Sequence, residues 1–130
     1  MKYKVRISDA QRLITEDHEI ATAQLLAKYF KCDVFFLAPR NSYKVKTPDI
    51  EVAGRLWELK SPTGQSHKNT IRDQLRRGSG QSRNIVIDTS RTQIADDVIE
   101  RQLHRYIVNR KGSIENLLMI DKRQAIRVIK

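Results

Sequence analysis

Residues 48–60 predict a β-hairpin, and this commits the chain to a β-sheet. Strand-like stretches at residues 50–52 and 56–60 flank Ala53 and Gly54, which suit a tight two-residue turn between paired strands. Because a hairpin turn of fixed length also fixes the register of its strands, the residue pairs across the hairpin follow directly from this assignment.

The predicted register puts three ionisable side chains on one face of the hairpin. With the turn at residues 53–54, Asp49 lies opposite Glu58. Since side chains alternate along a strand, Lys60 shares the face of Glu58 and Asp49. The other face is apolar and carries Ile50, Val52, Trp57 and Leu59. Two opposed carboxylates repel each other, and a divalent cation between them would remove that repulsion.

This face has the chemistry of a metal-dependent phosphodiesterase. Mg²⁺ prefers oxygen ligands, and it is commonly held by one or two carboxylates together with water and substrate phosphate. A nearby lysine such as Lys60 can orient the attacking water or stabilise the developing charge. The same spacing also fits an ordinary edge hairpin with a solvated, charged face, and spacing alone does not separate the two.

The rest of the chain alternates helical patterns with short apolar strands. The apolar spacing favours a helix over residues 9–30, with a later start near Thr15 or Asp17 as the alternative. The remaining elements are expected as follows: a strand at 33–38, a polar loop at 40–47, a helix capped by Ser66 or Asn69 with Gly78 past its end, a buried strand at 85–87, a helix from Ser90 or Thr92 to Arg110 with Gly112 as terminator, and strands at 117–120 and 125–129, the last at an edge. This order predicts one α/β domain over residues 1–130, with a central mixed sheet flanked by helices.

Composition favours a nucleic-acid partner. The 130 residues carry a formal net charge of +10, and such a surplus attracts phosphate backbones. The single cysteine, Cys32, permits no internal disulfide, and the three histidines lack zinc-like spacing. No apolar run approaches the length of a membrane span, and the N-terminus lacks the apolar core of a signal peptide. We therefore expect no membrane partner, and either a cytoplasmic protein or a fragment released from a larger one.

A basic cluster follows the hairpin and is a candidate contact for a nucleic-acid backbone. Its members are Lys68, Arg72, Arg76, Arg77 and Arg83. The first four fall on the polar side of the predicted helix, opposite two apolar residues. The alternative is a solvated amphipathic helix with no binding role. Because the cluster lies close to the hairpin in the sequence, the two interpretations are equally favoured.

The hairpin sequence carries a family resemblance. Residues 47–64 resemble the core of the PD-(D/E)XK nuclease superfamily and, more narrowly, the C-terminal toxin domain of CdiA-type contact-dependent growth inhibition proteins. The likeness takes in residues 19–27 upstream and continues through residues 70–75 and 81–88, with little after Asp88. The longer run with Trp57, Ser61-Pro62 and Gln81 is more specific than the short superfamily motif.

The resemblance implies a restriction-endonuclease-like α/β core and a set of site residues. It implies an endonuclease that uses Mg²⁺ or Mn²⁺, bound by Asp49, Glu58 and the backbone carbonyl of Leu59, with Lys60 acting on the water. It also places a helix acid at Glu19, where Glu16 and Asp17 are local alternatives and where the helix dipole alone favours acids.

Four accessory residues complete the candidate site. The resemblance makes Gln81 a familiar accessory position, although loop polarity also explains it. Ser61 and Thr63 carry hydroxyls that can bind phosphate or water, but they also fit plain turn chemistry. His67 is a candidate proton donor, with a simple surface histidine as the stronger reading.

The resemblance also bears on substrate and partners. It favours tRNA over DNA as substrate, and it implies a cognate immunity protein that binds over the site. As a delivered toxin domain, the chain would act in the cytoplasm of a target cell. The alternatives are a DNA endonuclease of the same fold and a non-catalytic nucleic-acid-binding module.

Overall fold

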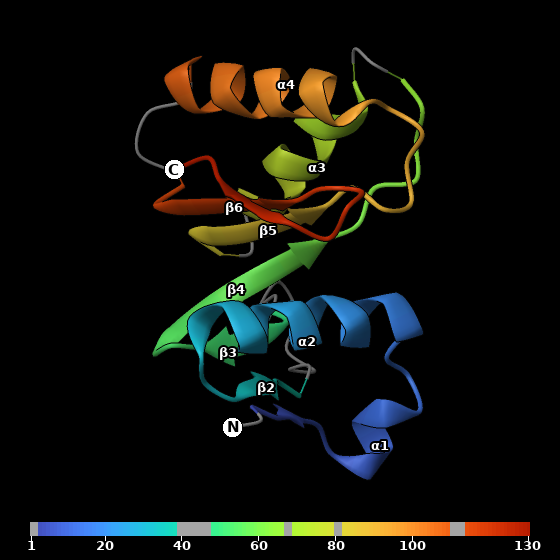
Figure 1. The fold of residues 1–130 in the computed structure, drawn as a ribbon, viewed down its shortest axis with the longest axis vertical. Helices are drawn as coiled ribbons and strands as arrows, with labels where there is room; N and C mark the ends of the chain where they lie inside the picture. The colour runs from blue at the N-terminus through green and yellow to red at the C-terminus, as the bar shows by residue number, and fades with distance from the viewer. Residues whose placement is uncertain (1–2, 39–47, 67–68, 80–81, 110–113) are drawn as a thin grey trace. The chain divides into compact units, whose positions relative to one another are not determined.

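The computed structural model describes residues 3–38, 48–66, 69–79, 82–109 and 114–130. These residues form four helices and a mixed sheet of seven strands, whose order across the sheet follows the order along the chain (Figure 1). The predicted α/β class is confirmed. Two compact units are present, the N-terminal unit Met1–Trp57 and the C-terminal unit Glu58–Lys130. Strand β4 (Arg55–Lys60) begins in the first unit and ends in the second.

The N-terminal unit packs one long helix against three strands. Strand β1 (Val5–Arg6) runs parallel to β2 (Val34–Phe36), and β2 pairs antiparallel with β3 (Ile50–Val52). Helix α2 (Asp17–Phe30) packs against all three strands, and the short α1 (Asp9–Arg12) precedes it. The buried apolar residues of α2 are Ile20, Ala23, Leu26 and Ala27.

The single helix predicted over residues 9–30 is wrong, because the chain forms two helices there. The Thr15 hydroxyl donates to the Gln11 carbonyl at 2.8 Å, where α1 has already ended. Helix α2 then starts afresh behind a capping box, in which Glu16 is the N-cap and Glu19 is its partner. The alternative start near Asp17 is therefore the one that the structure adopts.

The hairpin has the predicted turn and register. Ile50 pairs with Trp57, Glu51 with Leu56 and Val52 with Arg55. Ala53 and Gly54 have φ angles of 54° and 75°, and positive φ at both central residues is the condition for a type I′ hairpin turn. The buried side chains Ile50, Val52 and Trp57 share one face, as alternation requires.

The C-terminal unit places two helices on one face of a parallel three-strand core. Residues Glu58, Leu59 and Lys60 of β4 pair in parallel with β5 (Asn84–Asp88), and β5 pairs in parallel with β6 (Asn116–Ile120). The edge strand β7 (Ile126–Val128) is antiparallel to β6, as expected. Helices α3 (Thr70–Ser79) and α4 (Asp96–Asn109) lie on the same side of β5 and β6 (Figure 1).

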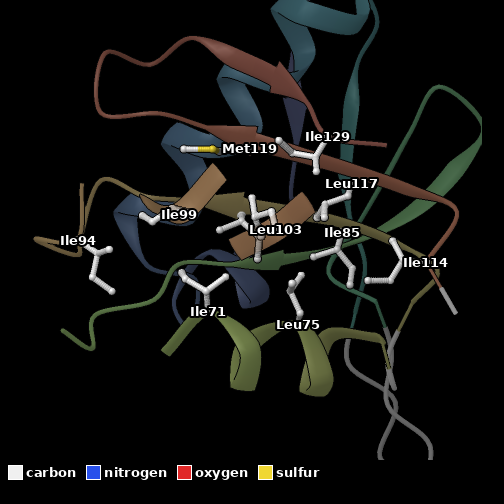
Figure 2. Close-up of a cluster of buried hydrophobic side chains, with 11 residues drawn as sticks. Ile71, Leu75, Ile85, Ile94, Ile99, Leu103, Ile114, Leu117, Met119 and Ile129 are labelled. Carbon is white, nitrogen blue, oxygen red and sulfur yellow. The ribbon is translucent and has the colours of Figure 1, made fainter. Parts of the chain in front are cut away.

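An apolar cluster fills the space between these helices and strands (Figure 2). Its members include Ile71 and Leu75 of α3, Ile99 and Leu103 of α4, Ile85 and Ile87 of β5, and Leu117 and Met119 of β6. Alternate residues of β5 and β6 contribute because they point to the helical face. Each fully buried side chain of this kind stabilises the fold by about 1.5–3 kcal/mol.

Two predicted helix boundaries in the C-terminal unit are wrong. Helix α4 begins at Asp96, not after Ser90 or Thr92, because the Thr92 hydroxyl donates to the Gly64 carbonyl at 2.6 Å and holds the chain out of helical geometry. Gly78 lies inside α3 and does not end it. The predicted loop at 40–47 and the terminator Gly112 lie outside the described residues.

Candidate active site

Glu58 and Lys60 form a buried ion pair on β4. The Lys60 Nζ lies 3.2 Å from Glu58 Oε2, and the lysine and glutamate side chains are only 18% and 3% exposed. Strand alternation puts both residues on one face, as the sequence predicts. A buried carboxylate held by an ammonium group is a charge-assisted interaction whose partners are both costly to remove.

Gly78 of α3 leaves the space through which the Lys60 side chain passes. A Cβ atom at Gly78 would lie 3.6 Å from Lys60 Cε and 3.1 Å from Ile85 Cδ1. A single Cβ would therefore touch Lys60 and crowd Ile85, and a longer side chain would collide with both. The close approach explains a glycine inside a helix, where its flexibility otherwise destabilises the helix by about 0.8–1 kcal/mol.

Asp49 lies directly before β3 in the N-terminal unit and is half-buried. Its backbone N–H donates to the Trp57 carbonyl at 3.0 Å, and its carbonyl accepts from the Leu37 N–H at 3.0 Å. The chain bends at Asp49, and its N–H and carbonyl bond to opposite neighbours, β4 on one side and the residue after β2 on the other. In a regular antiparallel strand both groups of a residue bond to the same neighbour, so strand alternation does not extend to Asp49. That Asp49 shares a face with Glu58 stays a prediction.

Glu19 has a structural task at the start of α2. Its Oε1 accepts a hydrogen bond from the Glu16 N–H at 3.1 Å and completes the capping box. Replacing the polar partner of such a cap typically destabilises a helix by about 1 kcal/mol. Capping by itself accounts for an acid at this position, so its role in a reaction stays a prediction.

The accessory residues differ in how the structure presents them. Leu59 is half-buried and pairs with Val86 of β5. The Ser61 hydroxyl is buried and has no hydrogen-bond partner among the described residues, whereas Thr63 is exposed. The predicted site residues Gln81, His67 and Lys68 lie outside the described residues.

The arginines of the basic cluster are exposed and only loosely neutralised. Arg76 Nη2 lies 3.1 Å from Asp73 Oδ1, Arg72 Nε lies 3.7 Å from the same atom, and both arginine side chains are more than half exposed. Arg83 pairs with Glu115 at 3.1 Å, and Arg77 is exposed. Because exposed ion pairs contribute only about 0–1 kcal/mol, a phosphate can replace these partners at little cost.

A family match covers the hairpin and most of the C-terminal unit. Residues 46–126 match the family described as the contact-dependent growth inhibition CdiA C-terminal domain. The chain belongs to this family. Membership supports a toxin of contact-dependent growth inhibition. The match runs past Asp88 through α4 and β6 to the first residue of β7, further than the sequence resemblance suggested, and it starts after α2.

One solved structure shares the fold along nearly the whole chain. It is the "CdiA-CT/CdiI toxin and immunity complex from Burkholderia pseudomallei", with a TM-score of 0.64, 24% sequence identity, and coverage of 98% of both chains. At this identity the likeness shows the fold alone. A comparison with curated proteins gives no significant match.

The described residues limit the kind of metal site that a member of this family could build here. Within the described ranges, no group of three or more His, Cys, Asp or Glu side chains is placed to hold a metal ion. Among the same residues, no helix combines the length and apolar character that a bilayer span requires.

Sequence reasoning missed the role of Gly78, which it placed beyond the end of a helix. The signal was present, because an isolated glycine within a helical pattern usually has a packing reason. Sequence alone does not show which side chain approaches the glycine, since Lys60 and Ile85 come from two different strands.

Proposed function

We propose that this chain is a metal-dependent endonuclease that hydrolyses phosphodiester bonds in tRNA, as a toxin of contact-dependent growth inhibition. The observation that carries the proposal is the buried Glu58–Lys60 pair, at 3.2 Å on β4. A fold gains little from burying such a pair where apolar side chains would pack equally well. Membership of the CdiA C-terminal domain family supports the toxin context, and the PD-(D/E)XK resemblance of residues 47–64 supports the reaction class.

The candidate metal ligands are the carboxylates of Asp49 and Glu58 and the backbone carbonyl of Leu59. All are oxygen donors, which fits Mg²⁺ or Mn²⁺ and leaves positions for water and phosphate. When bound, such an ion lowers the pKa of a coordinated water and offsets charge on the phosphoryl oxygens. Glu58 is buried and anchored by Lys60, so one carboxylate is already fixed in position before any ligand arrives.

Lys60 has two tasks in this proposal. Its ammonium group holds Glu58 in the orientation observed, and its remaining N–H groups can donate to the attacking water or to a phosphoryl oxygen. Because little water reaches the 18%-exposed side chain, a hydrogen bond from Lys60 is stronger there than at the surface. Gly78 keeps the path of this side chain open.

The other predicted residues are assigned supporting parts. Glu19 would act on the reaction through water, since one of its oxygens caps α2. Ser61, Thr63 and Gln81 would hold phosphate or water, and His67 would protonate the leaving oxygen. Of these side chains, Ser61 is the one whose hydroxyl is buried with no partner in the described part of the chain.

The basic cluster supplies the substrate affinity. Arg72, Arg76 and Arg77 of α3 and Arg83 before β5 are exposed, and Lys68 belongs to the same sequence segment. Their contacts would be made to backbone phosphates, which position a nucleic acid without reading its sequence. Since α3 also carries Gly78, the same helix would bind phosphates and border Lys60.

We expect a cognate immunity protein to bind over the site and block it. The solved structure with the same fold is a toxin and immunity complex, and for this chain the partner is a proposal. Action in the cytoplasm of a target cell follows from the same toxin context.

The test is incubation of the purified chain with total tRNA and, separately, with plasmid DNA, in Mg²⁺ or in EDTA. We expect tRNA cleavage in Mg²⁺ that is lost in EDTA and in Asp49→Ala, and kept in the control Asp97→Ala, whose side chain is exposed. Cleavage of plasmid alone would make DNA the substrate. Intact nucleic acids with retained binding would replace the nuclease with a non-catalytic binding module.

A further inference from the structure

Two apolar side chains are exposed on one face of the hairpin sheet, on either side of Glu51. Phe35 of β2 is 47% exposed and Leu56 of β4 is 45% exposed. Both pair with Glu51 of β3, Phe35 on one side and Leu56 on the other. The three side chains therefore form a row across neighbouring strands on one face, opposite the buried Val34, Ile50 and Trp57. All belong to the N-terminal unit.

Asp49 is a close neighbour of this row. It comes directly before β3, two residues ahead of Glu51 along the chain. The Leu37 N–H donates to the Asp49 carbonyl at 3.0 Å, which shows that the β2 and β3 chains stay paired up to Asp49.

We propose that Phe35, Glu51 and Leu56 form a nucleobase subsite, in which an unpaired base of the substrate stacks on Phe35 beside Asp49. This inference deepens the proposed nuclease and rests on it. An exposed aromatic ring offers a flat face to any base, and Leu56 adds apolar surface on the far side of Glu51. Bases splayed out of loops and single strands are the parts of RNA that proteins bind in this way.

The Glu51 carboxylate favours binding of a base over binding of the phosphate backbone at this row. Its carboxylate is exposed between the two apolar side chains. A carboxylate repels phosphate, whereas it accepts hydrogen bonds from the exocyclic amino groups of bases. The row therefore suits a base and not the backbone, and it favours bases that carry an amino group over uracil.

The test measures binding without cleavage, in EDTA. The probes are short single-stranded RNAs of adenosine and of uridine and a length-matched RNA of abasic residues. The proteins are the full chain, Phe35→Ala, Phe35→Trp and Glu51→Gln. The matched control is Leu13→Ala, which truncates an 87%-exposed apolar side chain of the same unit. A second RNA with 2-aminopurine in place of adenine reports stacking through fluorescence quenching.

We expect Phe35→Ala to weaken binding of the adenosine RNA about tenfold, the effect of losing one base–aromatic stack. Binding of the abasic RNA should stay the same, Phe35→Trp should keep both the affinity and the quenching, and Leu13→Ala should change neither. Glu51→Gln should reduce the preference for adenosine over uridine RNA. Since cleavage plays no part, the result is independent of whether the chain is a nuclease.

Two results would overturn the inference. Equal losses for adenosine and abasic RNA would mean that Phe35 acts on the fold or on the backbone and not on a base. Unchanged RNA binding in Phe35→Ala would leave the exposed row to a protein partner.

Discussion

The two units of the chain differ in how many large apolar side chains they expose and in their balance of basic and acidic residues. Five of the seven large apolar side chains that are exposed among the described residues belong to the N-terminal unit, including Phe35 and Leu56. The C-terminal unit holds its apolar residues in the cluster under α3 and α4. It also has fifteen Lys and Arg against eight Asp and Glu, compared with ten against seven in the N-terminal unit. The C-terminal unit is thus the more basic and the more fully packed of the two, and the N-terminal unit leaves more large apolar side chains exposed.

Truncation of matched core leucines tests this contrast in packing. Leu103 and Leu26 are both fully buried, the first in the large cluster of the C-terminal unit and the second in the N-terminal unit. We expect Leu103→Ala to destabilise the chain by about 4 kcal/mol and Leu26→Ala by about 2–3 kcal/mol. The cost is smaller for Leu26 because the side chains around it, in the smaller and less fully packed N-terminal unit, can relax into the cavity more completely. Urea unfolding measures both. A larger loss for Leu26→Ala would contradict the contrast.

Substitutions at Gly78 test whether the packing of the C-terminal unit also supports the candidate site. Gly78→Leu should destabilise the C-terminal unit by about 1–3 kcal/mol through overpacking and should also reduce tRNA cleavage, since the new side chain displaces Lys60. Gly78→Ala isolates the smaller clash with Ile85 Cδ1 at 3.1 Å. Ile85→Val removes that atom but also costs stability of its own, about 0.5–1.5 kcal/mol, so thermal unfolding of both single variants and of the double variant is needed. The double variant should lose less stability than the sum of the two single losses. Simple additivity would show that the clash lies elsewhere.

Acid should weaken both units, and the C-terminal unit more. Burial raises the pKa of Asp121, but hydrogen bonds from the Ala125 amide, the Arg127 guanidinium and the Arg123 amide outweigh it, so the pKa lies below its ordinary value. Hydrogen bonds from the Lys4 amide and from Arg6 lower the pKa of Asp33 in the N-terminal unit. Both contributions are complete above the unfolded pKa of about 4 and are lost as the pH falls through the lower folded values.

Asp121→Asn separates the two contributions. Asp121 is buried and Asp33 is partly exposed, so Asp121→Asn should lower stability at pH 7 more than Asp33→Asn does and should flatten the fall of stability between about pH 5 and pH 2. Urea unfolding across this pH range measures the slopes. Identical slopes for wild type and Asp121→Asn would show that this carboxylate adds nothing to acid sensitivity.

Removing one arginine charge is expected to have the smallest effect. Arg76→Gln on α3 should weaken tRNA binding by about 0.5–1 kcal/mol and reduce the slope of log affinity against log salt by about one, as for a single phosphate contact. The control Arg55→Gln removes an exposed arginine at the hairpin turn of the N-terminal unit. An equal change in both variants would mean that binding follows net charge and not the basic cluster.

What the sequence predicted well was local. The hairpin register followed from Ala53-Gly54, since turn length and alternation fix every pair up to Ile50 and Trp57. The errors came where distant residues decide the outcome. Thr92 was predicted to cap a helix, but its hydroxyl instead bonds to the distant Gly64 carbonyl. Gly78 was predicted to end a helix, but it lies within α3, where Lys60 and Ile85 from two strands pack close to it.

The candidate site divides in the same way. That Glu58 and Lys60 share a face was predictable from strand period, and their pairing at 3.2 Å agrees with it. The burial of Glu58 was not predictable, because it depends on tertiary packing that no local pattern encodes. The exposure of Phe35 was likewise hidden, since an apolar strand sequence normally indicates a buried one.

The most direct test of the account is tRNA cleavage in Mg²⁺ by Glu58→Gln, with tRNA binding measured in EDTA on the same samples. The substitution keeps the shape of the buried side chain but removes its charge, and thermal unfolding would check the fold. We predict that cleavage falls about 10²–10³-fold, as for other single groups that stabilise a transition state, while binding stays within about twofold, since the basic cluster is intact. Wild-type rates of cleavage in this variant would contradict the account.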